Sequence, residues 1–392
     1  MSGRQQRRAF NLAVTWLFVA AGLRVTILAP EVCPPLTTAA ALGSAAAAAG
    51  WIADNQGVDG RFLYELDRDT GSASDDYNLV RHAGTTMTLY QVIRYGGPGA
   101  GSERFPTAAD RALDLMLSQV VTTGEDAAAW GEPGTDLKLG AAALLAVSLL
   151  ERRAINGDTA HDELLVELGT FMAGQQQPDG SMLDLWDRAT GAPNPAVRSR
   201  YATGEALWAL ALLHETFPGE GFDEVAWATL DYLATSRDEV EGLSPRPWPD
   251  QWAAYSLEAM GDWGLADHHL AYARELSGQF GVAIRWDSQR SGIGTVTHPP
   301  QPRGAGFGTV LEGSSMLQRL AAFEPRLADL AEPLADRVRC GAARLATAQT
   351  MTAGGPEAEA GAWFRDGVTR MDDQQHAASA MLWVAPLAGN DR

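Results

Sequence analysis

Apolar residues recur with a period near 3.6 along most of the chain after residue 36, and this period is typical of amphipathic helices. The 41 glycines and 20 prolines gather between the periodic segments, where turns are expected. No alternating stretch is long enough for a sheet, so the pattern predicts an all-α protein of twelve helices in six pairs. These helices are predicted at residues 37–54, 78–94, 106–121, 137–155, 160–175, 200–216, 223–236, 250–261, 265–279, 307–323, 327–350 and 373–385.

The second helix of each pair opens in a similar way, with a polar or charged residue followed by small residues and leucines. Small residues allow helices to pack closely around a crowded centre. We therefore expect these six helices to form an inner ring whose polar N-termini share one cavity. The openings begin at Arg81, Asp136, Arg200, Asp250, Thr309 and Asp373.

Two loops 120 residues apart match without a gap. Residues 56–71 and 176–191 are identical at eight of sixteen positions, which indicates one structural unit used twice. In each loop an Asp-Gly pair supplies a tight turn, because glycine accepts the positive φ that other residues resist. A degenerate third copy is predicted at residues 361–367. At 392 residues the chain suits one closed ring of six helical hairpins, an (α/α)6 toroid, as a single domain over residues 36–392.

The first 35 residues have the character of an export signal. Arg4, Arg7 and Arg8 precede an apolar run from residue 12 to 23, which is the order found in secretory signals. The pair Arg7-Arg8 followed by Ala9-Phe10 also resembles a twin-arginine address. We predict a signal peptide or membrane anchor over residues 1–35, twin-arginine or Sec export, and an extracytoplasmic or membrane-anchored location. A disordered extension, or a start codon placed too far upstream, stays an alternative.

The net charge of −19 argues against a nucleic-acid partner. Lys138 is the only lysine, and the preference for arginine fits the codon habit of a GC-rich genome. Cys33 and Cys340 supply neither a disulfide framework nor a zinc cluster. They could pair only if the segment around Cys33 folds back onto the domain, and we do not expect this. We expect no metal and no cofactor.

The motif from Gln176 to Ser181, Gln-x-x-Asp-Gly-Ser, resembles a loop of the terpenoid-cyclase and prenyltransferase toroids. The layout of six pairs over residues 37–387 is similar to the six-hairpin glycosidase and sugar-epimerase toroids. The Asp-x-Asp-Asp run of squalene-type cyclases is missing, and Asp372-Asp373-Gln374-Gln375-His376 lacks the last carboxylate of the Asp-Asp-x-x-Asp diphosphate motif. The zinc ligands of protein prenyltransferases and lanthionine-type cyclases are missing too. The resemblance therefore implies the sugar-active branch.

Glycoside cleavage needs two carboxyl groups across the scissile bond, and aromatic faces that stack on sugar rings. Glu205 and Glu312 lie one turn into predicted inner helices, each beside a glycine, and twelve tryptophans are available. Asp373 and His376 fall on one helix face, where the carboxylate can orient the imidazole and raise its pKa. We predict Glu205, Glu312, Asp373 and His376 as catalytic residues.

Several inner helices carry cations in their first turn, where the helix dipole disfavours them. Arg81 and His82 follow the acidic run at Asp75 and Asp76, and Lys138 opens another inner helix. An acidic glycan would explain these cations, but ion pairs across the ring explain them equally well and are favoured here. Asp250 suits a helix N-cap. The predicted substrate-binding residues are Asp76, Arg81, His82, Tyr201, Asp250 and Trp252.

The leading hypothesis is a carbohydrate-active enzyme that cleaves a glycosidic bond with a carboxylate pair in the central cavity. Its partner would be a glycan or another small polar substrate, with membrane association through the N-terminus. A sugar epimerase using a histidine pair such as His82 and His376, or a lyase of the same fold, stays open. A different class is a non-catalytic binding or scaffold toroid of the cell envelope, which would have its centre plugged by side chains. Terpenoid chemistry would need an apolar cavity.

Overall fold

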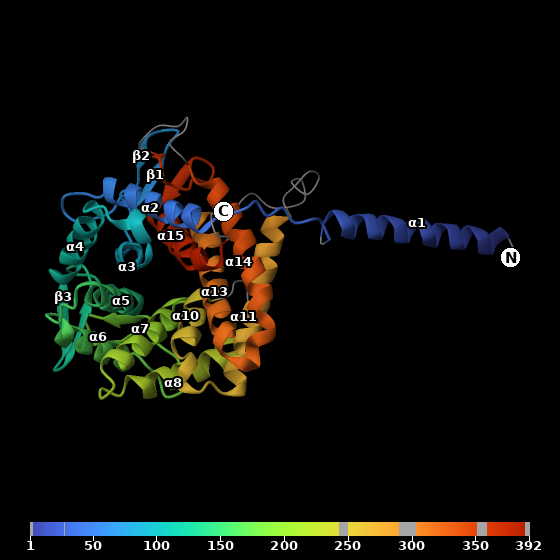
Figure 1. Cartoon of the computed structure of the whole chain (residues 1–392). Helices are drawn as coiled ribbons and strands as arrows, with labels where there is room; N and C mark the ends of the chain where they lie inside the picture. Colours follow the sequence, from blue (N-terminus) through green and yellow to red (C-terminus); the bar gives the residue numbers. More distant parts are fainter. Residues whose placement is uncertain (1–2, 27, 243–249, 290–302, 351–358, 389–392) are drawn as a thin grey trace.

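The computed structural model describes residues 3–26, 28–242, 250–289, 303–350 and 359–388. Over these residues twelve helices form two concentric rings, which confirms the predicted six pairs (Figure 1). The inner ring consists of α3 Leu79–Tyr95, α5 Leu139–Asn156, α7 Ala202–Thr216, α10 Gln251–Ala259, α13 Gly304–Phe323 and α15 Met371–Val384. The outer ring consists of α2 Thr38–Asp54, α4 Arg104–Leu117, α6 Asp162–Gly174, α8 Phe222–Thr235, α11 Asp267–Ser288 and α14 Ala328–Ala348.

Each inner helix packs against the next one in the chain, and α15 packs against α3 and α2, which closes the ring. The inner helices are buried on almost every side. In α5, for example, every residue from Leu139 to Leu149 is buried, and alanines and a glycine fill its first turns. A helix that is apolar all round belongs in a protein interior, and its small side chains let neighbouring backbones approach closely.

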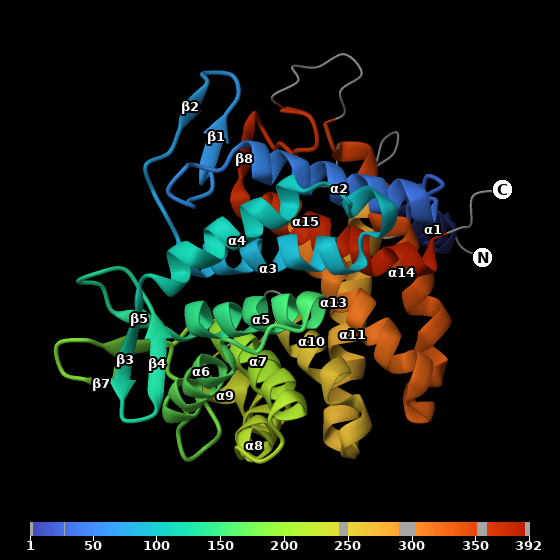
Figure 2. The ribbon, with the colours of Figure 1, turned by 60° about the vertical axis from the view of Figure 1, so that its left-hand side comes forward.

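Short strands in the loops are a departure from the all-helical prediction. They are β1 Glu65–Asp67, β2 Ser72–Ala73, β3 Val120–Gly124, β4 Ala127–Trp130, β5 Leu137–Lys138, β6 Leu185–Asp187, β7 Ala192–Pro193 and β8 Val368–Arg370. They pair as β2-β1-β8, β3-β4 and β5-β6-β7, all antiparallel, and the labelled strands gather on the left of Figure 2. The predicted helix at 106–121 ends at Leu117, because β-branched Val120, Val121 and Thr122 favour the β3-β4 hairpin.

The repeated loop occurs three times, as the sequence suggested. Gly60, Gly180 and Gly361 all have positive φ, at 90°, 84° and 93°. In each case a β-carbon would meet a backbone carbonyl oxygen of a neighbouring outer helix. The distances would be 2.6 Å from Gly60 to Arg111, 2.2 Å from Gly180 to Ala228 and 2.2 Å from Gly361 to Ala47. Only glycine fits at these three positions, both for backbone geometry and for space.

A glutamine at the end of an outer helix accompanies each of these glycines. Its side-chain amide donates to a backbone carbonyl of the next hairpin's outer helix, and its backbone forms a bridge with the apolar residue after the turn. The Nε2···O distances are 2.9 Å for Gln56 to Ala108, 2.8 Å for Gln176 to Val225 and 2.9 Å for Gln349 to Ser44. The loop unit therefore fastens neighbouring outer helices, and its third copy joins α14 to α2 where the ring closes.

The N-terminal helix α1, Gly3–Val25, has no buried residue and projects away from the ring (Figure 1). By length and composition it could cross a membrane, a test that a signal sequence near the N-terminus also passes. The segment after it is bonded to the ring. The Glu31 carboxylate accepts hydrogen bonds from Ser288 (2.6 Å) and from Arg337, and the Val32 N–H donates to the Ser288 carbonyl (2.9 Å).

Cys33 and Cys340 form a disulfide, contrary to the sequence-based expectation of free cysteines. The pairing arises because the segment containing Glu31 folds back onto α11 and α14, which the sequence pattern does not reveal. The predicted boundary between residues 35 and 36 thus cuts through a segment that is covalently joined to the ring. Removal of the residues before this segment, as a signal peptide, stays a prediction.

We expect the disulfide to stabilise the ring by about 2–4 kcal/mol, because it ties residues 307 positions apart in the unfolded chain. Under oxidising conditions, the double variant Cys33→Ser/Cys340→Ser should therefore unfold at a lower denaturant concentration than the native protein. A reducing agent should lower the midpoint of the native protein and leave that of the double variant unchanged. Equal midpoints with and without reductant would show that the bond contributes nothing.

Candidate active site

The first turns of the six inner helices surround a cavity of about 550 Å³ at one end of the ring. Its walls are rich in charged and polar side chains, unlike the apolar cavity that terpenoid chemistry requires. The side chains that dominate it come from every inner helix or from the residue just before it. They include Asn78, Arg81, Lys138, Tyr201, Glu205, Gln251, Trp252, Thr309, Asp372, Gln375 and His376, with Asp184, Ser199, Arg303, Arg365 and Arg370 from the adjoining loops.

Glu205 is the most perturbed carboxyl group in this cavity. Burial, with smaller contributions from the charges of Asp184 and Asp250, raises its pKa to about 8, so the group is protonated at neutral pH. The position of its carboxyl group depends on a glycine in the neighbouring helix α5. A β-carbon on Gly140 of α5 would lie 2.0 Å from the Glu205 Oε2. The glycine at that position therefore makes room for the carboxyl group.

Asp184 is the second carboxyl group on this side of the cavity and comes from the loop before β6. Burial raises its pKa, and the positive charge of Lys138 opposes that rise. Its own charge is one of the causes of the high pKa of Glu205. A carboxyl group whose pKa is raised by a charged carboxylate can act with it as an acid–base pair, in which one holds a proton and the other is charged.

His376 lies in the wall of the cavity on α15 and is anchored from behind. Its Nδ1 is 2.7 Å from the Glu312 Oε2, and Glu312 also accepts a hydrogen bond from the Tyr255 hydroxyl (3.3 Å). Trp383 Nε1 donates to the same Tyr255 oxygen at 2.7 Å. Burial disfavours the imidazolium form, but the Glu312 carboxylate outweighs it and raises the pKa of His376.

A basic arc borders the other side of the cavity. The Arg81 Nε is 3.0 Å from Asp372, and Arg370 donates to both oxygens of the same carboxylate. Burial raises the pKa of Asp372, but the two guanidinium groups overcome this and hold it below its usual range. Arg303 lies 3.6 Å from Glu65 and 3.7 Å from Asp373, at the long end of ion pairing.

Of the ten residues predicted from sequence, five line this cavity: Arg81, Tyr201, Glu205, Trp252 and His376. Trp252 is almost fully buried and stacks on Trp208, so only its edge reaches the cavity. Tyr201, by contrast, is 40% exposed at the rim.

Two of the predicted catalytic residues lie behind the wall. Glu312 is fully buried beneath His376, where it orients the imidazole. Asp373 is also buried and accepts hydrogen bonds from the backbone N–H groups of Ala305 (2.9 Å) and Arg370 (3.0 Å). These bonds tie down the starts of two inner helices, so the structure gives Asp373 a capping role.

Three predicted substrate-binding residues lie outside the cavity. His82 is buried between Tyr77 and the Ala112 carbonyl, and burial lowers its pKa to about 4. Asp250 is the N-cap of α10 and pairs with Arg237 at 2.6 Å. Asp76 is exposed in the loop before α3, whose N-cap is Asn78 rather than an aspartate. A first-turn position in the sequence does not reveal which way a side chain points, so it does not decide whether a residue faces the cavity.

The sequence analysis overlooked the loop residues of the cavity. Asp184, Arg365 and Arg370 come from copies of the repeated loop or from the strands beside them. That repeat was the signal that could have located them, because each copy precedes an inner helix. Its residues were interpreted only as turns, since the Asp-Gly pair already accounted for the motif.

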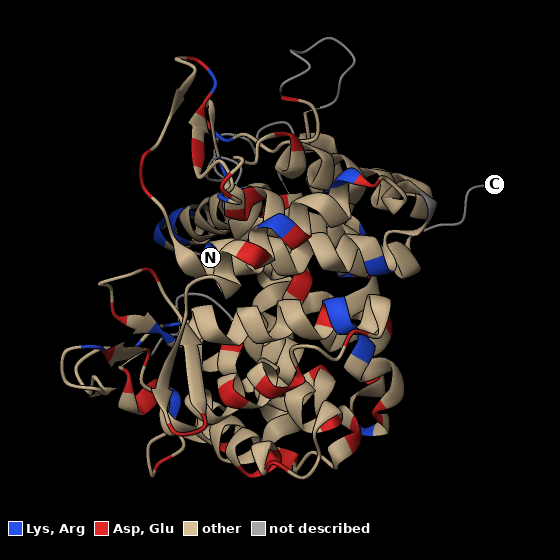
Figure 3. Cartoon of the chain, turned by 90° about the vertical axis from the view of Figure 1, so that its left-hand side faces the viewer, with Lys and Arg blue, Asp and Glu red and all other residues tan. Residues whose placement is uncertain are grey.

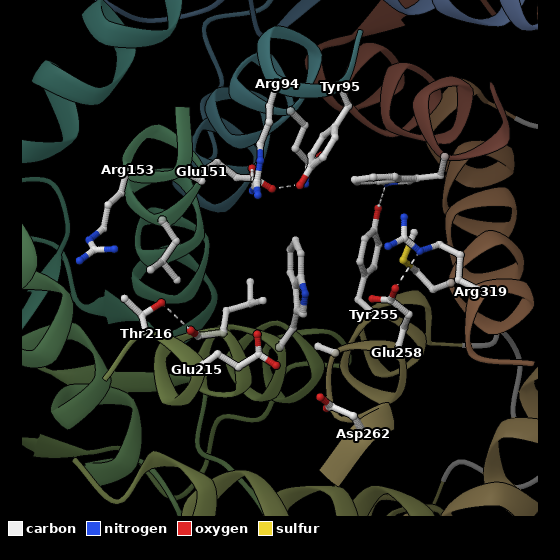
Figure 4. A pocket seen from close by; sticks show the side chains of 18 of the residues that line it. Arg94, Tyr95, Glu151, Arg153, Glu215, Thr216, Tyr255, Glu258, Asp262 and Arg319 are labelled. Atoms are coloured by element: carbon white, nitrogen blue, oxygen red, sulfur yellow. Dashed lines mark hydrogen bonds and ion pairs between the residues drawn. The ribbon is translucent and has the colours of Figure 1, made fainter. Parts of the chain in front are cut away.

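A second cavity of about 610 Å³ opens at the opposite end of the ring, where the inner helices finish (Figure 4). Its charged residues are largely matched in ion pairs, at 2.8 Å between Arg94 and Glu151 and 2.7 Å between Arg319 and Glu258. Burial raises the pKa of Glu215 there. The hydrogen-bonded chain from Trp383 to His376 connects the two cavities through the centre of the ring.

One cluster outside both cavities has the composition of a metal site. Asp231 lies 2.7 Å from the His268 Nε2 and 2.8 Å from the His269 Nε2. The Ala266 N–H donates to the His269 Nδ1, so in the neutral ring Nε2 carries the proton and donates to Asp231. The cluster is satisfied as a network of hydrogen bonds that caps α11.

Solved structures with the same ring architecture cover nearly the whole domain. An α-1,6-mannanase from Salegentibacter sp. HEL1_6 superposes with a TM-score of 0.56 at 14% identity, covering 88% of this chain and 99% of its own. A cellobiose 2-epimerase from Bacillus thermoamylovorans gives 0.56 at 10% identity, over 86% and 95% of the two chains. An unsaturated glucuronyl hydrolase specific for heparin gives 0.57 at 9% identity, over 89% and 97%.

No protein-family model matches the sequence, and no curated protein matches it significantly. The likeness to these solved structures thus lies in the fold alone. The chain has the same fold as these structures, a toroid of six helical hairpins.

Proposed function

We propose that the protein is a carbohydrate-active enzyme that cleaves a glycosidic bond in the cavity at the N-terminal ends of the inner helices. The observation that carries this proposal is that two carboxyl groups, Glu205 and Asp184, line one polar cavity, where burial raises the pKa of both. Cleavage of a glycosidic bond needs one carboxyl group as an acid and another as a base or nucleophile.

In this mechanism Glu205 donates its proton to the oxygen of the leaving group. Asp184 in its charged form acts as the base or nucleophile at the sugar ring, with Lys138 favouring that charged form. Tyr201, exposed at the rim, supplies aromatic surface for a sugar ring. His376, held by Glu312, positions hydroxyl groups of the substrate.

A sugar epimerase or lyase is the second candidate, and the coupling of His376 to Glu312 favours it, because such a pair can move a proton at carbon. The pairing of His82 with His376 that an epimerase would use has no support, since the ring of His82 is outside the cavity. Incubation with a glycan panel, followed by separation of the products, distinguishes the reactions. Shorter saturated sugars indicate hydrolysis, unsaturated sugars a lyase, and an unchanged chain length with altered stereochemistry an epimerase.

A non-catalytic toroid of the cell envelope would be expected to fill its centre and to pair its polar groups. The cavity of about 550 Å³ weighs against that class, and so does the Glu205 carboxyl group, which pairs with none of the described residues. No turnover on any glycan, together with unaltered glycan binding by a Glu205→Gln variant, would favour the scaffold.

The protein acts outside the cytoplasm in this proposal, as an exported or membrane-anchored enzyme. The Cys33–Cys340 disulfide supports this, because such bonds persist in oxidising compartments, and the apolar α1 supports it as a signal or anchor. A glycan screen should therefore retain the segment from residue 29 onward, so that both cysteines remain. Detection of the native protein only in the cytoplasmic fraction would overturn this location.

The pH dependence of the rate is a direct test of Glu205 as the acid. Because its pKa lies near 8, the rate should fall as the pH rises through about 8, with a tenfold loss per unit beyond it. On the acid side the rate should fall when Asp184 becomes protonated, above the usual range of an aspartate. A rate that is constant from pH 6 to pH 10 would remove Glu205 as the acid.

A further inference from the structure

The single lysine of the chain lies at the mouth of the cavity. Lys138 is the N-cap residue of α5, and its side chain lines the cavity. Its ammonium group forms no ion pair or hydrogen bond with any described residue, although its charge acts on Asp184. The N-terminus of a helix is an unfavourable place for a cation, because the helix dipole is positive there. The fold alone therefore does not explain the ammonium group.

The other cations noted in the sequence have structural explanations. Arg81 and Arg370 share the carboxylate of Asp372, and His82 is neutral and buried. Ion pairs across the ring thus account for the arginine, as favoured from the sequence. Within the described part of the chain, Lys138 is the cation among those noted in the sequence that ion pairing and burial do not explain.

The balance of charge around the cavity is positive. Five cations line it, namely Arg81, Lys138, Arg303, Arg365 and Arg370. The acidic residues in the same lining are Asp184, Asp372 and Glu205, and Glu205 is protonated at neutral pH. The net charge of the whole protein is −19, and acidic residues spread over the helices in Figure 3. The mouth is therefore a basic region in an acidic molecule.

The basic residues also occupy one continuous part of the ring. Arg303, Arg370, Arg81 and Lys138 stand at the starts of α13, α15, α3 and α5, which are successive neighbours in the inner ring. Glu205 and Trp252 belong to α7 and α10, which complete the ring. A ligand in the cavity would thus have the acid group and aromatic surface on one side and the cations on the other.

We infer that the cavity selects an anionic sugar, a uronate or a sulfated sugar, whose oxyanion binds Lys138 beside the basic arc. The inference rests on the proposed function, since it takes this cavity to be the substrate site. The oxyanion pairs with the free ammonium group and is drawn to the N-termini of six inner helices. A neutral sugar would leave Lys138 with only the electrostatic attraction of Asp184.

Binding of three monosaccharides to the full-length protein tests this inference by calorimetry. The probes are glucose, glucuronate and glucose 6-sulfate, which differ in charge at one position of the ring. We expect glucuronate or glucose 6-sulfate to bind at least about tenfold more tightly than glucose, with an affinity that falls as salt is added. A preference for one of the two acids identifies the source of the oxyanion.

Three variants assign the effect to Lys138. Lys138→Gln should weaken binding of the preferred acid by about tenfold and leave glucose unaffected, whereas Lys138→Arg should retain most of the affinity. Arg274→Gln removes one positive charge from the outer surface, where Arg274 pairs with Asp329. It should leave the affinity for all three sugars unchanged. Unaltered thermal stability of Lys138→Gln would confirm that the fold does not need this side chain.

Equal affinity for all three sugars, undetectable binding of both acids at millimolar concentration, or an unchanged affinity in Lys138→Gln would each overturn the inference. These outcomes are separable from failure of the proposed function. Selective binding of an acid without cleavage of any glycan would reject the hydrolase and uphold the selectivity. Cleavage that requires Glu205 but acts on neutral glycans would do the reverse.

Discussion

Replacement of Glu205 by glutamine is expected to lower the rate of glycosidic bond cleavage by about 10²–10⁴-fold, the usual contribution of a general acid. Glutamine keeps the size of the protonated carboxyl group and can still form hydrogen bonds, but its amide has no acidic proton to transfer to the leaving group. Initial rates on the glycan that the panel identifies would measure the effect. Substrate affinity should change far less than the rate, because the side chain's shape is retained.

Two further variants make this result specific. Gly140→Ala places a methyl group 2.0 Å from the Glu205 Oε2, so it should displace the carboxyl group and lower the rate, although alanine favours a helix over glycine. Glu215→Gln removes a partly buried carboxyl group with a raised pKa from the opposite cavity and should leave the rate unchanged. Full activity of Glu205→Gln would exclude the acid role.

The Glu205→Gln variant should also be at least as stable as the native protein above pH 8. The folded-state pKa of Glu205 is about 8, well above its ordinary 4.5. The folded protein therefore binds more protons than the unfolded chain between these values, and the stabilising contribution of Glu205 is lost as the pH rises through the folded pKa. Glutamine does not ionise, so this loss should disappear. Thermal melts of both proteins across this pH range would measure the difference.

Replacement of Gly180 by alanine is expected to destabilise the ring by about 3 kcal/mol or more. The residue has φ 84°, and the added methyl group would lie 2.2 Å from the Ala228 carbonyl oxygen, which is backbone and cannot turn aside. The clash would push the Asp-Gly turn away from α8. It would also strain the nearby hydrogen bond from Gln176 to Val225.

Gly191→Ala in the same loop is the matched control. Gly191 has φ 66°, but its added methyl group would meet only a ring carbon of Trp186 at 4.0 Å. Its cost should be limited to the backbone term of about 1–2 kcal/mol. Equal denaturation midpoints for the two variants would mean that close packing at Gly180 has no energetic weight.

Helix periodicity predicted the ring well because each helix buries one face against its neighbours, and the sequence records this as a repeat of apolar residues. The predicted helix boundaries were wrong where strand pairing determines the local structure. At Val120 the β3-β4 hairpin replaces the predicted end of a helix. Glu205 and His376 were found because a carboxylate or imidazole among small residues is conspicuous in an inner helix.

The remaining parts of the site depend on directions and distances that no local pattern encodes. Glu312 and His376 are 64 residues apart, and only the fold decides which of them faces the cavity. Asp184 and Lys138 come together because β5 pairs with β6. Cys33 reaches Cys340 because the chain before α2 turns back onto α14.

The closed ring has a consequence for the order of its parts. The Thr38 hydroxyl donates to the Ala385 carbonyl at 3.0 Å, so the first outer helix begins where the last inner helix ends. The Gln349 loop joins α14 to α2 as the Gln56 loop joins α2 to α4. The contacts that close the ring at α2 are therefore of the same kind as those between other neighbouring hairpins. The architecture consequently permits circular permutation, in which the start of α2 is linked to the end of α15 and the chain opens at another exposed turn, such as the one between β3 and β4.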